Sequence, residues 1–180
     1  AKPHQGKKYQ FTTDIKDFYP SISSKRVYDT FISLGFSPHF SHWLTKLTTW
    51  KRELPQGAPT SSHIANLVFL KTDIKIIAFC NEHKLTYTRY IDDLTFSAPQ
   101  DFKVLLNDIL NIVTSDGYNL SYRKTEYAGN QTITGIKVFL NKIDAPENIK
   151  SKSRIEIESN KPVKPYTNYV KTIRKTNIKK

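Results

Sequence analysis

The sequence is poor in sulfur-containing side chains and has no long apolar run. It holds one cysteine, Cys80, and no methionine. This excludes an internal disulfide framework, argues against a zinc cluster and favours a reducing compartment. No apolar stretch reaches transmembrane length, and the first residues lack the apolar core of a signal peptide. Because the chain begins at Ala1 and lacks methionine, we expect it to be part of a longer protein.

Acidic side chains are scarce as well. The 180 residues include 16 Asp and Glu against 28 Lys and Arg, which gives a net charge of +12 and a sequence pI of about 9.7. This excess of positive charge predicts a polyanionic partner. Nucleic acid is the favoured partner, and an acidic membrane surface is the alternative. With 38% hydrophobic and 12% aromatic residues, most of the chain can form a core, which excludes disorder as its general state.

The apolar pattern changes its period several times along the chain. Alternation over 9–14 predicts a strand that ends at Asp14. The further elements predicted are helices at 24–34, 40–47, 61–82 and 102–113, a hairpin of strands 85–90 and 94–97, and a strand at 132–140. This order is the split βαβ pattern of an α+β fold, ferredoxin-like or RRM-like, with an antiparallel sheet and helices packed on one face.

The last forty residues differ in composition from the rest. Residues 141–180 hold 11 basic and 4 acidic side chains, so seven of the twelve net positive charges lie there. They also contain Pro146, Pro162 and Pro165. We expect residues 1–140 to form one unit and 141–180 a basic extension, either partly ordered or the beginning of a further element.

Three acidic residues stand out in this basic chain. Asp14 ends the first predicted strand, and Asp92 and Asp93 lie at the tip of the predicted hairpin. Carboxylates gathered in this way repel one another, and the hard cations that hold them together are Mg²⁺ or Mn²⁺. Two such ions can assist phosphoryl transfer. The alternative is that Asp92 and Asp93 form an ordinary solvated turn, because Asp is a common turn residue.

Four blocks of sequence follow the order and spacing of the reverse transcriptase palm. They are FTTDIKDFYPSIS (11–23), LPQGAPTSSHIANLVF (54–69), YTRYIDDLTFS (87–97) and TITGIKV (132–138). The chain most resembles bacterial retron-type reverse transcriptases. The resemblance implies a polymerase palm with a small remnant of the fingers over 1–140, and the start of a thumb or connector over 141–180.

The resemblance implies a catalytic centre with two Mg²⁺ or Mn²⁺ ions. Asp14 matches the first metal-binding aspartate of the family, and Ile15 would offer its backbone carbonyl to one ion. Asp92 and Asp93 match the two aspartates of the Tyr-x-Asp-Asp block. Lys124 matches a lysine that approaches the triphosphate and donates a proton to the pyrophosphate.

Other matches imply the nucleotide site. Asp17 and Phe18 match a loop whose backbone N–H groups hold the triphosphate. Tyr19 matches an aromatic gate that rejects a 2′-hydroxyl by bulk, which favours dNTPs over NTPs. Gln56 and Gly57 match the block that lines the nucleotide and template, where glycine permits close backbone approach.

The primer and template contacts implied by the resemblance are Tyr90, Ile91, Thr134 and Gly135. Ile91 stands where relatives usually have Ala or Met, and its β-branched side chain would touch the primer. Thr134 and Gly135 match the primer-grip strand that seats the 3′ end.

Taken together, the motifs predict an RNA-directed DNA polymerase that uses an RNA template, a DNA or RNA primer and dNTPs in the bacterial cytoplasm, without a membrane. A structured non-coding RNA partner and a role in antiviral defence are expected from the retron resemblance. Two alternatives stay open. One is an untemplated or protein-primed DNA polymerase of an abortive-infection system, and the other is a non-catalytic palm fragment that binds RNA.

Overall fold

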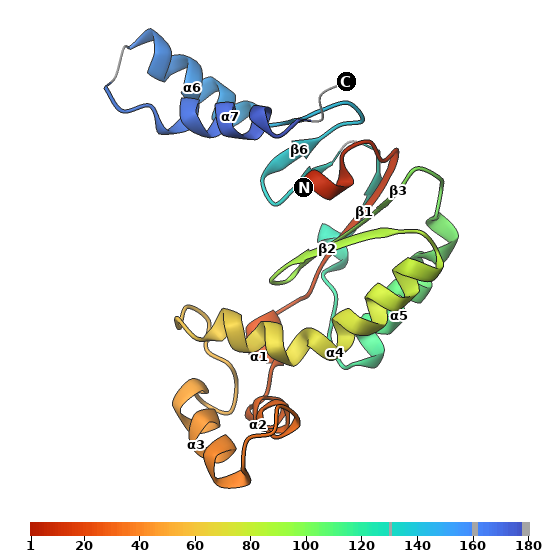
Figure 1. The fold of residues 1–180 in the computed structure, drawn as a ribbon, viewed down its shortest axis with the longest axis vertical. Coiled ribbons are helices and arrows are strands. Elements are labelled where there is room, and N and C mark those ends of the chain that lie inside the picture. The colour runs from red at the N-terminus through yellow and green to blue at the C-terminus, as the bar shows by residue number, and fades with distance from the viewer. Residues whose placement is uncertain (130, 160–161, 178–180) are drawn as a thin grey trace.

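The computed structural model describes residues 1–129, 131–159 and 162–177. Its main sheet has four antiparallel strands in the spatial order β2-β3-β1-β4 (Figure 1). Their bounds are β1 (Tyr9–Asp14), β2 (Thr86–Tyr90), β3 (Asp93–Ala98) and β4 (Glu126–Ala128). The two central strands, β1 and β3, therefore come from segments that are far apart in the sequence.

The alternation of side chains gives this sheet one apolar and one polar face. Phe11, Phe96 and Tyr87 are cross-strand neighbours on the apolar face. The ring centroids of Phe11 and Phe96 lie 5.8 Å apart, and those of Phe96 and Tyr87 4.9 Å apart. The opposite face carries the intervening polar residues of the same strands, among them Thr12 and Thr95, which are also paired.

Two helices cover the apolar face (Figure 1). They are α4 (Ser61–Glu82) and α5 (Leu106–Ser115), and α5 follows the 3-10 turn η2 (Lys103–Leu105). Phe69 and Ile76 of α4 and Ile109 and Val113 of α5 join Phe11 in one buried cluster. The predicted α+β fold, with an antiparallel sheet and helices on one face, is confirmed.

Three further helices connect β1 to α4: α1 (Phe18–Ser21), α2 (Ser24–Ser33) and α3 (Pro38–Thr48). Serine side chains cap two of them, because Ser23 accepts from the N–H of Arg26 and Ser37 from that of Phe40. Gly35, at φ +91°, follows α2 in the left-handed conformation expected of a helix stop. α2 and α3 lie at the opposite end of the molecule from α6 (Glu147–Glu158) and α7 (Pro165–Lys175) (Figure 1).

The strand predicted at 132–140 is wrong. This segment forms a tight hairpin of β5 (Thr132–Ile133) and β6 (Ile136–Val138). Thr134 and Gly135 turn the chain because both have positive φ, 45° and 77°. The fourth strand of the main sheet is β4, which is too short to show an alternating pattern. The predicted helix at 102–113 also begins later, at Leu106, after the 3-10 turn.

A second, smaller core follows the main sheet. Strand β7 (Ile143–Asp144) pairs with β6 to complete a three-stranded sheet with β5. Six buried residues join this sheet to α7: Ile133, Val138, Ile143, Ala145, Val170 and Ile173. Because this core has members on both sides of residue 140, β5 and β6 pack with the basic extension. The assignment of 141–180 to a thumb or connector stays a prediction, and residues 160–161 and 178–180 lie outside the described part.

Candidate active site

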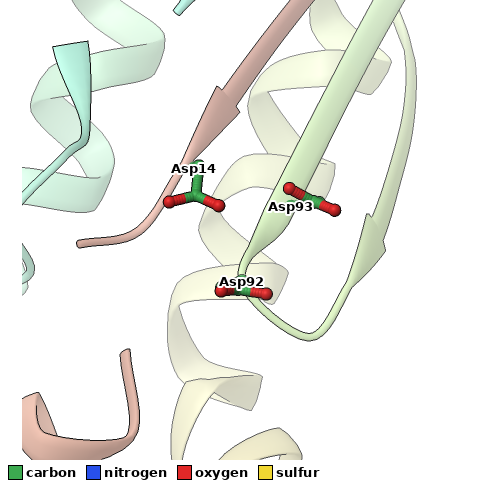
Figure 2. Close-up of side chains that lie close together, drawn as sticks. All are labelled: Asp14, Asp92 and Asp93. Carbon is green, nitrogen blue, oxygen red and sulfur yellow. The ribbon is translucent and has the colours of Figure 1, made fainter. Parts of the chain in front are cut away.

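Three carboxylates converge where the central strands meet the β2–β3 turn. Asp14 is the last residue of β1, and its cross-strand partner Asp93 is the first residue of β3. Asp92 lies in the turn itself, and Figure 2 shows the three side chains grouped together. One carboxylate oxygen from each lies within 4.8 Å of the others. The predicted cluster of Asp14, Asp92 and Asp93 is therefore present in the structure.

The β2–β3 turn holds Asp92 in place through a strained backbone. Tyr90 pairs with Asp93, so Ile91 and Asp92 alone make the turn. Ile91 has φ 56°, a left-handed conformation that is costly for a β-branched residue. The N–H of Ile15 donates to the carbonyl of Asp92 over 3.0 Å. This bond ties the turn to the chain immediately after Asp14.

A buried arginine supports the same turn from the apolar face. Arg89 Nη1 donates to the carbonyl of Ile91 at 2.7 Å, while its Nη2 donates to Asp73 of α4 at 2.6 Å. The side chains of Arg89 and Asp73 are only 9% and 16% exposed. The hydroxyl of Tyr87 donates to the same carboxylate at 2.7 Å. Burial, reinforced by Asp73, raises the pKa of Tyr87, so its hydroxyl stays protonated as a donor.

The electrostatics of the carboxylate cluster favour a cation. Burial raises the pKa of Asp93, and the negative charges of Asp92 and Asp14 raise it further. Lys124, in the 3-10 turn η3 (Tyr122–Lys124), donates to Asp14 Oδ2 at 2.8 Å, and this bond raises the lysine pKa. One ammonium group cannot balance three carboxylates. The oxygen donors and the remaining negative charge fit a hard divalent cation.

A groove extends from the carboxylates along the polar face of the main sheet. The hairpin tip of β5 and β6 reaches this groove, which brings Thr134 to the same cavity as Asp14, Asp93 and Lys124. Further residues of its lining were not predicted: Thr12, Thr13, Leu94, Thr95, Glu126, Thr132 and Ile133. Strand alternation would have indicated Thr12 and Thr95, since each lies two residues from an aspartate of the cluster.

The three residues expected at the nucleotide follow Asp14 closely but have different environments. Asp17 is exposed and has φ 49°, immediately before α1. The ring of Phe18 is buried and packs edge-on against Phe69 at 5.6 Å, so only its backbone is available to a ligand. Tyr19 is half-buried, and its ring centroid lies 5.9 Å from that of Phe18.

The loop that contains Gln56 and Gly57 is exposed. It is anchored at its start, where the N–H of Leu54 donates to the carbonyl of Ile22 at 3.0 Å. This bond fixes the loop next to the end of α1. Tyr90, at the end of β2, is 63% exposed and free to meet a ligand.

The sheet, its covering helices and the acidic cluster together define a polymerase palm. The family model described as reverse transcriptase (RNA-dependent DNA polymerase) matches residues 1–162. The chain belongs to the reverse transcriptase family.

Curated relatives support the predicted retron type. The chain is 38% identical over 148 residues to the retron Ec86 reverse transcriptase of Escherichia coli, a match that covers 79% of this chain and 46% of the relative. It is 33% identical over 179 residues to the retron Mx162 reverse transcriptase of Myxococcus xanthus, covering 81% and 37%. The chain thus spans less than half the length of these relatives. The predicted resemblance to retron-type reverse transcriptases is confirmed.

A solved structure shows the same fold at low sequence identity. Apo telomerase from Candida Tropicalis, truncated from the C-terminal domain, superposes with a TM-score of 0.60 at 13% identity. The match covers 77% of this chain and 35% of that one. In the described part of the chain, no helix has the length and apolar character that crossing a membrane requires.

Proposed function

We propose that this chain is the catalytic palm of an RNA-directed DNA polymerase, which adds dNTPs to the 3′ end of a DNA or RNA primer on an RNA template. One observation carries the proposal: Asp14, Asp92 and Asp93 converge, and Asp14 and Asp93 line a polar groove. An RNA-binding sheet of the RRM type reads bases with aromatic side chains and has no use for three converging acids. The non-catalytic alternative is therefore disfavoured.

The carboxylates of Asp14, Asp92 and Asp93 would hold two Mg²⁺ or Mn²⁺ ions, with the carbonyl of Ile15 as a further ligand. When bound, such ions activate the attacking 3′-oxygen and stabilise the leaving pyrophosphate. Lys124 donates to Asp14. Its ammonium group would turn to the triphosphate and give a proton to the departing pyrophosphate.

The remaining contacts that we propose are those implied by the resemblance to reverse transcriptases. Asp17 and Phe18 would hold the triphosphate through backbone N–H groups, and Tyr19 would exclude a 2′-hydroxyl. Gln56 and Gly57 would line the nucleotide and template. On the primer side the contacts would be Tyr90, Ile91, Thr134 and Gly135, and the presence of Thr134 in the groove supports this assignment.

The similarity to retron reverse transcriptases also supports a proposal for the cellular role of the parent protein. The parent protein would work in the bacterial cytoplasm, bind a structured non-coding RNA and contribute to antiviral defence.

A primer-extension assay tests the proposal. The 180-residue chain is given a DNA primer annealed to RNA, the four dNTPs and Mg²⁺ or Mn²⁺, and Mn²⁺ binding is measured in parallel. We expect extension that requires the RNA and that Asp92→Asn abolishes. Products formed equally without template would favour the untemplated alternative. Mn²⁺ binding without extension would refute polymerase activity by this chain, and neither binding nor extension would refute the site as well.

A further inference from the structure

The surface of α3 exposes aromatic and apolar side chains, none of which lines the groove around Asp14 and Asp93. Phe40, Trp43 and Leu47 are spaced along one side of the helix and are 49%, 50% and 79% exposed. Phe36, just before α3, is 41% exposed, and its ring lies 5.5 Å from that of Phe40. Trp50, just after α3, is 68% exposed. Such a concentration of exposed rings marks an interaction surface.

Positive charge is interleaved with these rings, and the one acidic residue of the segment 34–53 is Glu53, exposed at the end of the turn after α3. The segment 34–52 contains no Asp or Glu, while Lys46, Lys51 and Arg52 are exposed within it. The ammonium group of Lys46 lies 5.3 Å from the centre of the Trp43 ring. His39 and His42 both pack edge-on against the same ring.

A concave site lies between α2 and α3, next to these rings. Its described lining has cations and hydroxyl groups but no carboxylate: Ser24, Lys25, Tyr28, His42, Thr45, Lys46, Thr49 and Arg52. Of its cations, Lys25 is bonded to Asp29 at 2.6 Å, outside the lining. This chemistry suits a phosphate group.

The turn after α3 presents two of the cations at a structural cost. Trp50 and Glu53 pair through both backbone hydrogen bonds, at 2.9 and 3.0 Å. The two residues between them, Lys51 and Arg52, have φ 50° and 69°. A two-residue turn with positive φ at both positions favours Asn-Gly. Long cationic side chains here indicate a use other than stability.

We propose that α3 and the Trp50–Glu53 turn form a binding surface for single-stranded nucleic acid, separate from the catalytic groove. Bases stack on Trp43, Phe40 and Trp50, and the backbone phosphates follow Lys46, Arg52 and the concave site beside them. Stacking platforms of this kind combine exposed rings with a cationic track. A protein partner fits less well, since lysine is depleted in interfaces between proteins, whereas Lys46 and Lys51 lie among these rings. Because binding here needs neither a metal ion nor a dNTP, the inference goes beyond the proposed polymerase function.

The chain contains only two tryptophans, and both lie on this surface. Intrinsic tryptophan fluorescence therefore reports on the proposed site alone. The chain is titrated with oligo(U) RNA and with oligo(dT) DNA of about 12 nucleotides, a length within known site sizes, in EDTA and without dNTPs. We expect strong quenching that weakens with salt, whereas heparin, a polyanion without bases, binds with little quenching. Preference between the two oligonucleotides distinguishes RNA from DNA as the natural ligand.

Two variants and a control separate stacking, charge and folding. Trp43→Ala is expected to weaken oligonucleotide binding, measured by fluorescence anisotropy of a labelled strand, by roughly 10- to 100-fold. The double substitution K51N/R52G supplies the residues that the turn favours, so it should bind more weakly while its Tm stays the same or rises. Lys171→Ala, on exposed α7, is the matched control and should leave binding unchanged.

Other outcomes would overturn the proposal. Absence of quenching with both oligonucleotides would do so, as would unchanged binding by Trp43→Ala. Self-association of the chain that Leu47→Glu disrupts, without oligonucleotide binding, would show that the surface contacts protein. Because all these measurements exclude metal and dNTPs, their failure is independent of any failure in primer extension.

Discussion

Replacing Arg89 tests whether the β2–β3 turn, which carries Asp92, depends on the buried ion pair between Arg89 and Asp73. Arg89 donates to Asp73 through Nε and Nη2, and to the Ile91 carbonyl and Asn66 through Nη1. In Arg89→Ala the Asp73 carboxylate keeps the hydroxyl of Tyr87 as a donor but loses its cation. Breaking a buried ion pair in this way costs about 3–5 kcal/mol. That loss is a large fraction of the free energy of unfolding of a domain, which is about 5–15 kcal/mol.

The same substitution is expected to weaken metal binding. Without Arg89, the Ile91 carbonyl loses its donor and the left-handed turn is no longer held in place. Supporting contacts around metal ligands are commonly worth 10- to 100-fold in affinity, so we expect Mn²⁺ to bind about 10-fold more weakly. Urea unfolding of the 180-residue chain gives the stability, and calorimetric titration gives the Mn²⁺ affinity.

A double variant separates the two effects. Arg89→Met with Asp73→Asn removes both charges and leaves an amide oxygen to accept from Tyr87. We expect it to regain most of the lost stability but not the Mn²⁺ affinity, because the Ile91 carbonyl still lacks its donor. A cost below about 1 kcal/mol for Arg89→Ala, the value of a surface pair, would refute the stability argument. Full Mn²⁺ affinity in the double variant would refute the positioning argument.

Three further predictions concern the acidic centre, the sugar gate and pH. Asp92→Asn should keep the fold, judged by circular dichroism, but lose Mn²⁺ binding and lower primer extension by several orders of magnitude. Tyr19→Ala should lower the preference for dNTPs over NTPs by about 100-fold on one RNA template, and an unchanged ratio would make Tyr19 only a core aromatic. His4 is fully buried between Ser97 and Thr88, at 2.7 and 2.8 Å, and burial lowers its pKa to about 4. The folded chain therefore keeps His4 neutral, whereas His4 of the unfolded chain takes up a proton below about pH 6.5. Because protonation favours the unfolded chain, the free energy of unfolding should fall by about 2 kcal/mol between pH 7 and pH 5. Urea unfolding at the two pH values checks this, and His4→Gln should remove that part of the loss.

The parts of the fold that could be predicted from the sequence are those in which apolar residues recur with the period of a strand or a helix. Strand β1 alternates up to Asp14, and the second strand of the β2–β3 hairpin alternates from Leu94 to Ala98, directly after the acidic pair. Helix α4 is long enough for its apolar character to exclude a strand. The aspartate cluster followed from these elements, because strand ends and hairpin tips are where side chains of different segments meet.

The parts that could not be predicted depend on contacts between distant segments. β4 has three residues, and its pairing with β1 defines it as a strand. The β-branched run 132–138 has high strand propensity, but the positive φ of Thr134 and Gly135 breaks it into a hairpin. Asp73 and Arg89 are far apart in the sequence, and no local pattern pairs them. Long-range packing also decides that α7 covers the second sheet through Val170 and Ile173.

The end of the main sheet that carries the carboxylate cluster combines several features that oppose folding. Three carboxylates repel one another there, Asp93 is partly desolvated, and Ile91 adopts a left-handed backbone conformation. The cross-strand pairing of Asp14 with Asp93 nevertheless fixes the cluster, because both belong to the central strands over the main core. A cation that bound only the folded chain would relieve the repulsion, so we expect metal binding at this site to raise the folding stability. The repulsion between the carboxylates would therefore be relieved by the ion that they are proposed to bind.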